Sequence, residues 1–228
     1  MEMIRRMRFL VLLFIAPISL ILAEERSAVI GDLLEGARKN LEAENFAGAH
    51  AALDRFEKAN KPTVESLDAR GCVYMEQGNF AEAAKAFEGA HDIDPASVPP
   101  RIHAGDLLFR QKKFPEAREV YETLLKETNI PSSNERLRFG ILITYLAEHE
   151  ERGARTALDS INFPAQTPAY YYAQAAWAFA HGQKPEARKW IRTAQEIFPA
   201  EAESWFARPL YELGWLKKKP PLRFYQSI

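Results

Sequence analysis

The fold of this chain is decided by residues 64–95, which have the sequence VESLDARGCVYMEQGNFAEAAKAFEGAHDIDP. Apolar and small residues recur every three to four positions on both sides of Gly78-Asn79, as expected for two amphipathic helices joined by a tight turn. Asp94-Pro95 then ends the second segment, because proline cannot continue a helix. The stretch therefore predicts a helical hairpin.

The pattern of this hairpin recurs along the chain, at intervals of 34 residues for the first three copies and after an insertion at residues 130–133 for the fourth. Its five copies lie near residues 30–63, 64–97, 98–131, 135–167 and 168–201. Small residues recur in the first segment at Ala37, Gly71, Gly105 and Ala175, and alanine recurs in the second segment at Ala49, Ala83, Ala117 and Ala187. The fourth copy is degenerate, since Leu142 stands where the others have a small residue. With its flanks, this pattern covers about four fifths of the chain and resembles the tetratricopeptide repeat.

The resemblance implies an all-α fold, in which residues 24–216 form a right-handed superhelical solenoid of about five helical hairpins with a C-terminal capping helix. The small residues would let helices pack closely, while larger residues such as Phe87 and Tyr121 would fill the space between neighbouring hairpins. Residues 202–216 are amphipathic and are expected to cover the last hairpin as the cap. Residues 217–228 are then expected to be a basic, frayed tail.

The N-terminus has the pattern of an export segment. Arg5, Arg6 and Arg8 precede an apolar run from Phe9 to Ala23, which is followed by two glutamates. Fifteen residues are few for a membrane-spanning helix, which needs about 20, so a cleaved signal peptide fits well. An uncleaved anchor over residues 1–23 remains the alternative, and it would be the only membrane contact. In both cases the body is expected to be exported, to the periplasm or the outer face of the cytoplasmic membrane.

Composition excludes several classes of function. A formal net charge of -1 lacks the basic excess of a nucleic-acid-binding protein, so no nucleic-acid partner is expected. The single cysteine, Cys72, excludes a disulfide framework and every multi-cysteine zinc motif. We therefore expect no metal and no cofactor. Cys72 itself is expected to be buried as a small apolar residue.

Catalytic motifs are absent from the sequence. It contains no glycine-rich phosphate loop, no His-Glu-x-x-His and no Gly-x-Ser-x-Gly. The five histidines are scattered, and we expect them to be unpaired surface residues, with His103 and His149 near the inner surface of the solenoid. The chain is therefore predicted not to be an enzyme.

The first helices of such hairpins line the concave groove, so the residues that face a partner can be predicted. The candidates are charged in the first two units and apolar or aromatic in the later ones: Glu35, Arg38, Glu65, Asp68 and Glu76, then Phe139, Ile143, Tyr172, Phe179 and Phe206. Residues 24–97 hold 15 acidic and 8 basic side chains, whereas residues 98–216 hold 15 of each. The groove is therefore predicted to change from acidic to aromatic along its length, although the same aromatic residues also fit the core of a tight superhelix.

The resemblance implies a protein that binds extended or helical peptide segments. The leading interpretation is a non-catalytic interaction scaffold of the bacterial cell envelope, whose groove holds a protein segment with a basic end and an apolar end. One alternative is a membrane-tethered structural or assembly factor that uses its convex or cap surface. Another is a glycan-binding accessory protein that uses Tyr172, Trp177 and Phe179.

Overall fold

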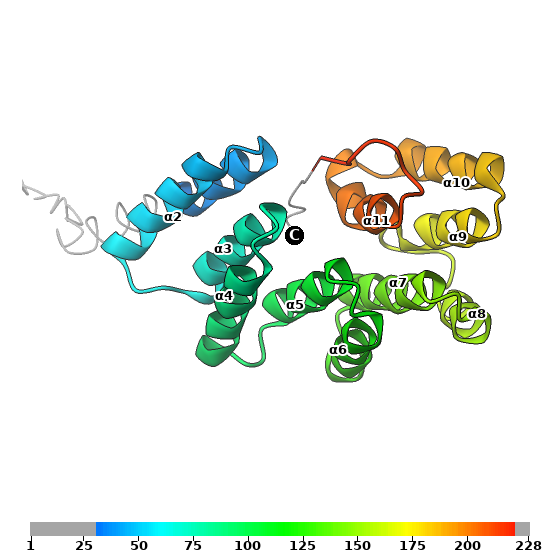
Figure 1. Cartoon of the computed structure of the whole chain (residues 1–228), viewed down its shortest axis with the longest axis horizontal. Coiled ribbons are helices and arrows are strands. Elements are labelled where there is room, and N and C mark those ends of the chain that lie inside the picture. Colours follow the sequence, from blue (N-terminus) through cyan, green and yellow to red (C-terminus); the bar gives the residue numbers. More distant parts are fainter. Residues whose placement is uncertain (1–30, 222–228) are drawn as a thin grey trace, which may run out of the picture.

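The computed structural model describes residues 31–221, which are helical apart from turns and short loops, with no strand in that range (Figure 1). The predicted export segment, residues 1–23, and the end of the predicted tail, residues 222–228, lie outside the described residues. Within residues 31–221, no helix combines the length and the apolar character needed to cross a membrane.

A helix over residues 31–42 precedes the helices that Figure 1 labels. Their bounds are α2 Phe46–Ala59, α3 Val64–Glu76, α4 Phe80–Ile93, α5 Val98–Arg110, α6 Phe114–Glu127, α7 Pro131–Ala147, α8 Glu151–Asp159, α9 Ala169–Ala180, α10 Lys184–Ile197 and α11 Ala200–Glu212. Helices α3 and α4, α5 and α6, α7 and α8, and α9 and α10 pair as hairpins. This arrangement confirms the predicted all-α repeat solenoid.

The first helices of the hairpins lie on the inner side of the curve. Direct contacts connect α3 to α5, α5 to α7 and α7 to α9, so these helices form a continuous layer. The second helices contact the first helices on either side of them, as α4 contacts both α3 and α5. A side chain on the inner face of a first helix can therefore meet one on the next first helix, about one repeat away in the sequence.

Helix ends follow from local sequence. Thr63 caps α3, because its hydroxyl accepts a hydrogen bond from the Ser66 amide at 3.2 Å while the Ser66 hydroxyl accepts one from the Thr63 amide at 3.0 Å. Pro115 and Pro185 lie in the first turns of α6 and α10, where a missing N–H costs no helical hydrogen bond. Gly78 has a φ of 77°, a left-handed conformation that lets the chain turn from α3 into α4.

Glycines on the first helices make room for aromatic rings. A Cβ atom at Gly71 would lie 2.3 Å from Cε1 of Phe87, and one at Gly105 would lie 2.5 Å from Cε1 of Tyr121. The ring of Tyr121 also lies close to the next hairpin, since a Cβ atom at Gly140 would lie 2.8 Å from its Cε2. These positions can therefore hold no larger residue without moving a ring.

Two clusters of buried side chains form the core, and they meet at α11. One cluster draws on α5 to α11, and the other on the first hairpin, α3, α4 and α5. Trp205 of α11 packs against both. Helix α11 lies beside α9 (Figure 1), and it begins and ends before the helix predicted over residues 202–216.

The described part of the basic tail, residues 217–221, is held against the first two hairpins. Nζ of Lys219 lies 3.0 Å from Oε1 of Glu44 and 3.3 Å from Oε2 of Glu76. The carbonyl oxygen of Pro220 accepts a hydrogen bond of 3.0 Å from Arg208. The prediction of a frayed tail is therefore wrong for these residues, because the acidic N-terminal hairpins attract the lysine.

Candidate functional site

The inner face of the solenoid is partly filled by α11. The ring of Trp205 stacks on His103 of α5, with ring centroids 5.0 Å apart and an interplanar angle of 20°. Arg136 of α7 lies 4.2 Å from the centroid of the same indole ring. Tyr172 of α9 donates a hydrogen bond of 3.0 Å to Glu203 of α11. The helix predicted to cap the last hairpin therefore also reaches across the groove to α5 and α7.

A buried carboxylate anchors α11 to α3. The Glu76 side chain is 4% exposed, and it forms ion pairs with Arg208 of α11, with Arg110 at 2.8 Å and with Lys219. Burial alone would raise the pKa of Glu76, but the three cations outweigh it and lower the pKa. The carboxylate is therefore charged in the folded protein and balances cations from three segments.

A second, half-buried carboxylate links α5, α6 and α7. Asp106 accepts a hydrogen bond of 2.8 Å from the hydroxyl of Tyr121 and pairs with Arg136. Burial and the charge of Asp106 raise the pKa of Tyr121 well above its usual value. Because Arg136 also covers the Trp205 ring, this network supports the position of α11.

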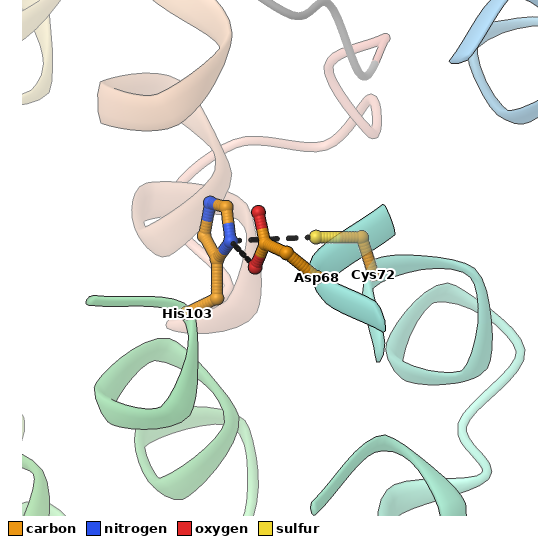
Figure 2. A group of neighbouring side chains, drawn as sticks. All are labelled: Asp68, Cys72 and His103. Carbon is orange, nitrogen blue, oxygen red and sulfur yellow. Dashed lines mark hydrogen bonds and ion pairs between the residues drawn. The ribbon is translucent and has the colours of Figure 1, made fainter. Parts of the chain in front are cut away.

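Three side chains with metal-binding atoms meet beside these networks. Asp68 and Cys72 lie one turn apart on α3, and His103 lies on α5 (Figure 2). Nδ1 of His103 is 2.7 Å from Oδ1 of Asp68 and 3.5 Å from Sγ of Cys72. Burial and the nearby carboxylates of Asp68, Glu76 and Asp106 raise the pKa of the Cys72 thiol.

Among the described residues, two cavities border α11 in the groove. An open cavity of about 530 Å³ is lined by residues of the first hairpin, α3, α5, α7, α11 and the two loops that precede α9 and α11. A second, smaller cavity of about 60 Å³ is bordered by Cys72, Glu76 and Phe139. Trp205 and Arg136 contribute to the walls of both.

The charged candidates from the sequence separate into three groups. Arg38 and Asp68 line the open cavity, which brings together residues from the first two repeats. Glu35 pairs at 3.7 Å with Lys39 on its own helix, and Glu65 is exposed on α3 outside the cavity lining. Glu76 is buried in its ion-pair network and does not present a free carboxylate to a partner.

The aromatic and apolar candidates lie in the core, and the expectation of an exposed aromatic half of the groove is wrong. Their exposed fractions are 2% for Phe139, 1% for Ile143, 1% for Tyr172, 7% for Phe179 and 4% for Phe206. The candidates on α7 and α9 are buried because the apolar face of α11, which includes Phe206, packs against them. Phe206 alone among them borders the open cavity.

Sequence reasoning missed the groups that organise this surface. His103 is 4% exposed and paired with Asp68, which corrects the expectation of an unpaired surface histidine. Arg208 and Arg136 also escaped notice, since each finds its carboxylate on a distant helix. A usable signal was the separation of 35 residues between Asp68 and His103, close to one repeat, which places both on the inner layer.

Comparisons with known proteins agree with this fold. Two family models described as tetratricopeptide repeats match the chain, one over residues 34–98 and one over residues 74–129. A solved structure described as a functional characterization of Pseudomonas aeruginosa pilF is similar, with a TM-score of 0.59 and 14% sequence identity. The likeness covers 82% of this chain and 85% of that chain, and at this identity it shows the fold alone. No curated protein matches the chain.

The stacked hairpins and their inner layer define a helical repeat protein of the scaffold class. The family matches identify tetratricopeptide repeats over residues 34–129. Such repeats mediate protein–protein interaction and generally have no catalytic role.

Proposed function

We propose that this protein is a non-catalytic scaffold of the bacterial cell envelope that binds an extended segment of a partner protein in the open cavity of its groove. The cavity of about 530 Å³ carries the proposal, because it is the larger of the two cavities that border α11 on the inner face. Export is supported by the arginines and the apolar run from Phe9 to Ala23.

The lining of the cavity suits a segment with apolar anchors and at least one charge. Its walls combine the apolar side chains of Val98, Ile102 and Phe198 with the charged side chains of Arg38 and Asp68. Apolar anchors supply most of the affinity in such sites, whereas charges at the rim fix orientation and speed association. The apolar end of the partner is therefore expected between α5 and the start of α11.

The acidic part of the proposed contact lies at the rim of the groove. Glu35 and Glu65 are solvent-accessible on the first two repeats, whereas Glu76 is committed to α11. A basic residue of the partner would meet these carboxylates beside the open cavity. The proposed partner is thus a peptide segment with a basic end and an apolar end.

Site-specific photo-crosslinking in the native cell tests this proposal. A photoreactive amino acid at Gln166, in the cavity wall, should give a discrete adduct with a partner protein. The same amino acid at the exposed Lys85 of α4 is the matched control and should give none. Ser133→Trp should fill the cavity and abolish the adduct from Gln166. Adducts that form equally well in the Ser133→Trp variant would refute binding in the cavity.

A second candidate function uses the outer edge of the solenoid. Large exposed apolar side chains recur at the ends of four successive hairpins or in the loops that follow: Ile93, Ile130, Phe163 and Ile197, with exposed fractions of 50%, 51%, 64% and 55%. This repeated edge favours an assembly factor that docks along one side of the solenoid. A crosslink from Ile130 but not from Gln166 would select this function.

A further inference from the structure

The structure places three metal-binding side chains in one buried group that no motif in the sequence indicates. Asp68 and Cys72 are four positions apart on α3 and therefore share one face of the helix. His103 comes from α5, the next first helix along the inner layer. The side chains converge from two helices on one point, as Figure 2 shows.

We propose that Asp68, Cys72 and His103 form a binding site for one divalent transition-metal ion of the zinc type. Their ligand atoms all lie within 4.8 Å of one another. Zinc bonds of about 2.0–2.3 Å hold neighbouring tetrahedral ligands roughly 3.3–3.8 Å apart. The 3.5 Å between Sγ and Nδ1 already matches this spacing, and the 2.7 Å between Oδ1 and Nδ1 needs to widen by less than about 1 Å.

The geometry favours a metal site over a catalytic triad. In a triad the nucleophile and the carboxylate contact opposite nitrogens of the histidine, so that one nitrogen takes the proton of the nucleophile while the carboxylate orients the ring. Here the thiol of Cys72 and the carboxylate of Asp68 both approach Nδ1 of His103. Ligand atoms that converge on one point can bind a shared ion. The same arrangement does not place Cys72 and Asp68 on opposite nitrogens of His103, as a triad requires.

The charges of the donors match a divalent cation. A thiolate at Cys72 and the carboxylate of Asp68 supply two negative charges, and His103 supplies a neutral nitrogen. Sulfur, imidazole nitrogen and carboxylate oxygen together are a donor set that zinc accepts. Burial and the carboxylates of Asp68, Glu76 and Asp106 raise the pKa of the Cys72 thiol, so a metal ion that binds there must displace the thiol proton to solvent.

The group has a route to solvent. Asp68 is 17% exposed at its side chain, and both it and His103 line the open cavity. A metal ion can enter from that side and complete its coordination with water. Cys72, which is 1% exposed, would hold the ion from the protein interior.

A bound ion would join α3 to α5 and, through the stack of His103 on Trp205, support α11. This metal site could not be predicted from a sequence motif, because known zinc motifs place several cysteines or histidines close together, whereas these three residues span two repeats. The site shares Asp68 and His103 with the wall of the open cavity, but metal binding is measured without any partner, so a failure of one proposal leaves the other standing.

Cobalt titration of the full-length chain tests the proposal. Because Cys72 is the single cysteine, any thiolate-to-cobalt charge-transfer band must come from it. Wild type should bind one Co²⁺ per chain with this band, and added Zn²⁺ should displace the ion and raise the melting temperature. Cys72→Ser should remove the band.

Two further variants separate a built site from a lone thiol. Asp68→Asn and His103→Gln should each weaken Co²⁺ binding by roughly tenfold or more, since even outer-shell changes at metal sites cost about that much. His91→Gln is the matched control, because His91 is exposed on α4 outside the group, and it should bind as wild type does. Circular dichroism of each variant checks that it is folded. Absence of the band in wild type, or affinities unchanged by Asp68→Asn and His103→Gln, would mean that the group is only a hydrogen-bonded cluster.

Discussion

The buried carboxylate of Glu76 gives a quantitative test of how α11 is held. Glu76→Gln keeps the size of the side chain and removes the charge that balances Arg208, Arg110 and Lys219. Removing one partner of a buried ion pair typically destabilises a protein by about 3–5 kcal/mol, because the remaining charges stay buried without compensation.

The surrounding contacts place the expected loss at the lower end of that range. In Glu76→Gln, Arg110 still forms an ion pair with Glu212 at 3.5 Å, and Lys219 still forms one with Glu44 at 3.0 Å. Both cations therefore retain a carboxylate partner. Arg208 keeps the carbonyl oxygen of Pro220, which is polar but uncharged. We therefore expect a loss of about 3 kcal/mol, or roughly 6–12 °C in melting temperature for a domain of this size.

Urea denaturation followed by circular dichroism measures this loss. Glu82→Gln is the control, since Glu82 pairs with Lys85 on the exposed surface of α4 and its loss should change the free energy of unfolding very little. A loss below about 1 kcal/mol for Glu76→Gln would refute the conclusion that this carboxylate holds α11 in the groove.

The pH dependence provides a second check on Glu76. Its pKa in the folded protein is lower than its usual value of 4.5, so its charge contributes stability that is fully present above that value. The contribution is lost as the pH falls through the lowered pKa, because a protonated glutamate is neutral, as glutamine is. The difference in stability between wild type and Glu76→Gln should therefore be constant above about pH 5 and shrink below it.

Two further predictions concern the hairpin packing and the N-terminus. Gly71→Leu should destabilise the protein by about 1–3 kcal/mol, because a Cβ atom there already meets the ring of Phe87, and Gly36→Ala should not, because nothing lies within 4 Å of its Cβ position. Equal melting temperatures for the two variants would contradict this packing. Residues 1–30 fused to a reporter that is active only outside the cytoplasm should be exported; reporter activity confined to the cytoplasm would exclude the envelope location.

The repeat fold could be predicted because its determinants are local and periodic. Gly71 and Gly105 occupy the same position in successive hairpins, and Pro115 and Pro185 start second helices in the same way. Each of these features depends on a single hairpin or on one pair of neighbours, and a sequence shows such features directly.

The inner surface could not be predicted to the same degree. Tyr172 and Phe179 have the spacing of groove residues, but whether they are exposed depends on how tightly the superhelix curves and where α11 goes. That curvature is the sum of small rotations between repeats, which composition and periodicity do not determine. The pairing of Glu76 with Arg208, which is 132 residues away, depends on the same curvature of the superhelix.

The pairing of Glu76 with Arg208 also changes how the protein should unfold. In an open array each repeat touches only its neighbours, so the terminal repeats can fray while the middle stays folded. Here Glu76 of α3 forms an ion pair with Arg208 of α11, and Trp205 packs against both hydrophobic clusters. The second hairpin therefore contacts a helix from the opposite end of the chain. Loss of either terminus would then open the other, and the chain should behave as a single cooperative unit, with amide hydrogens in α3 and α11 exchanging through the same opening event.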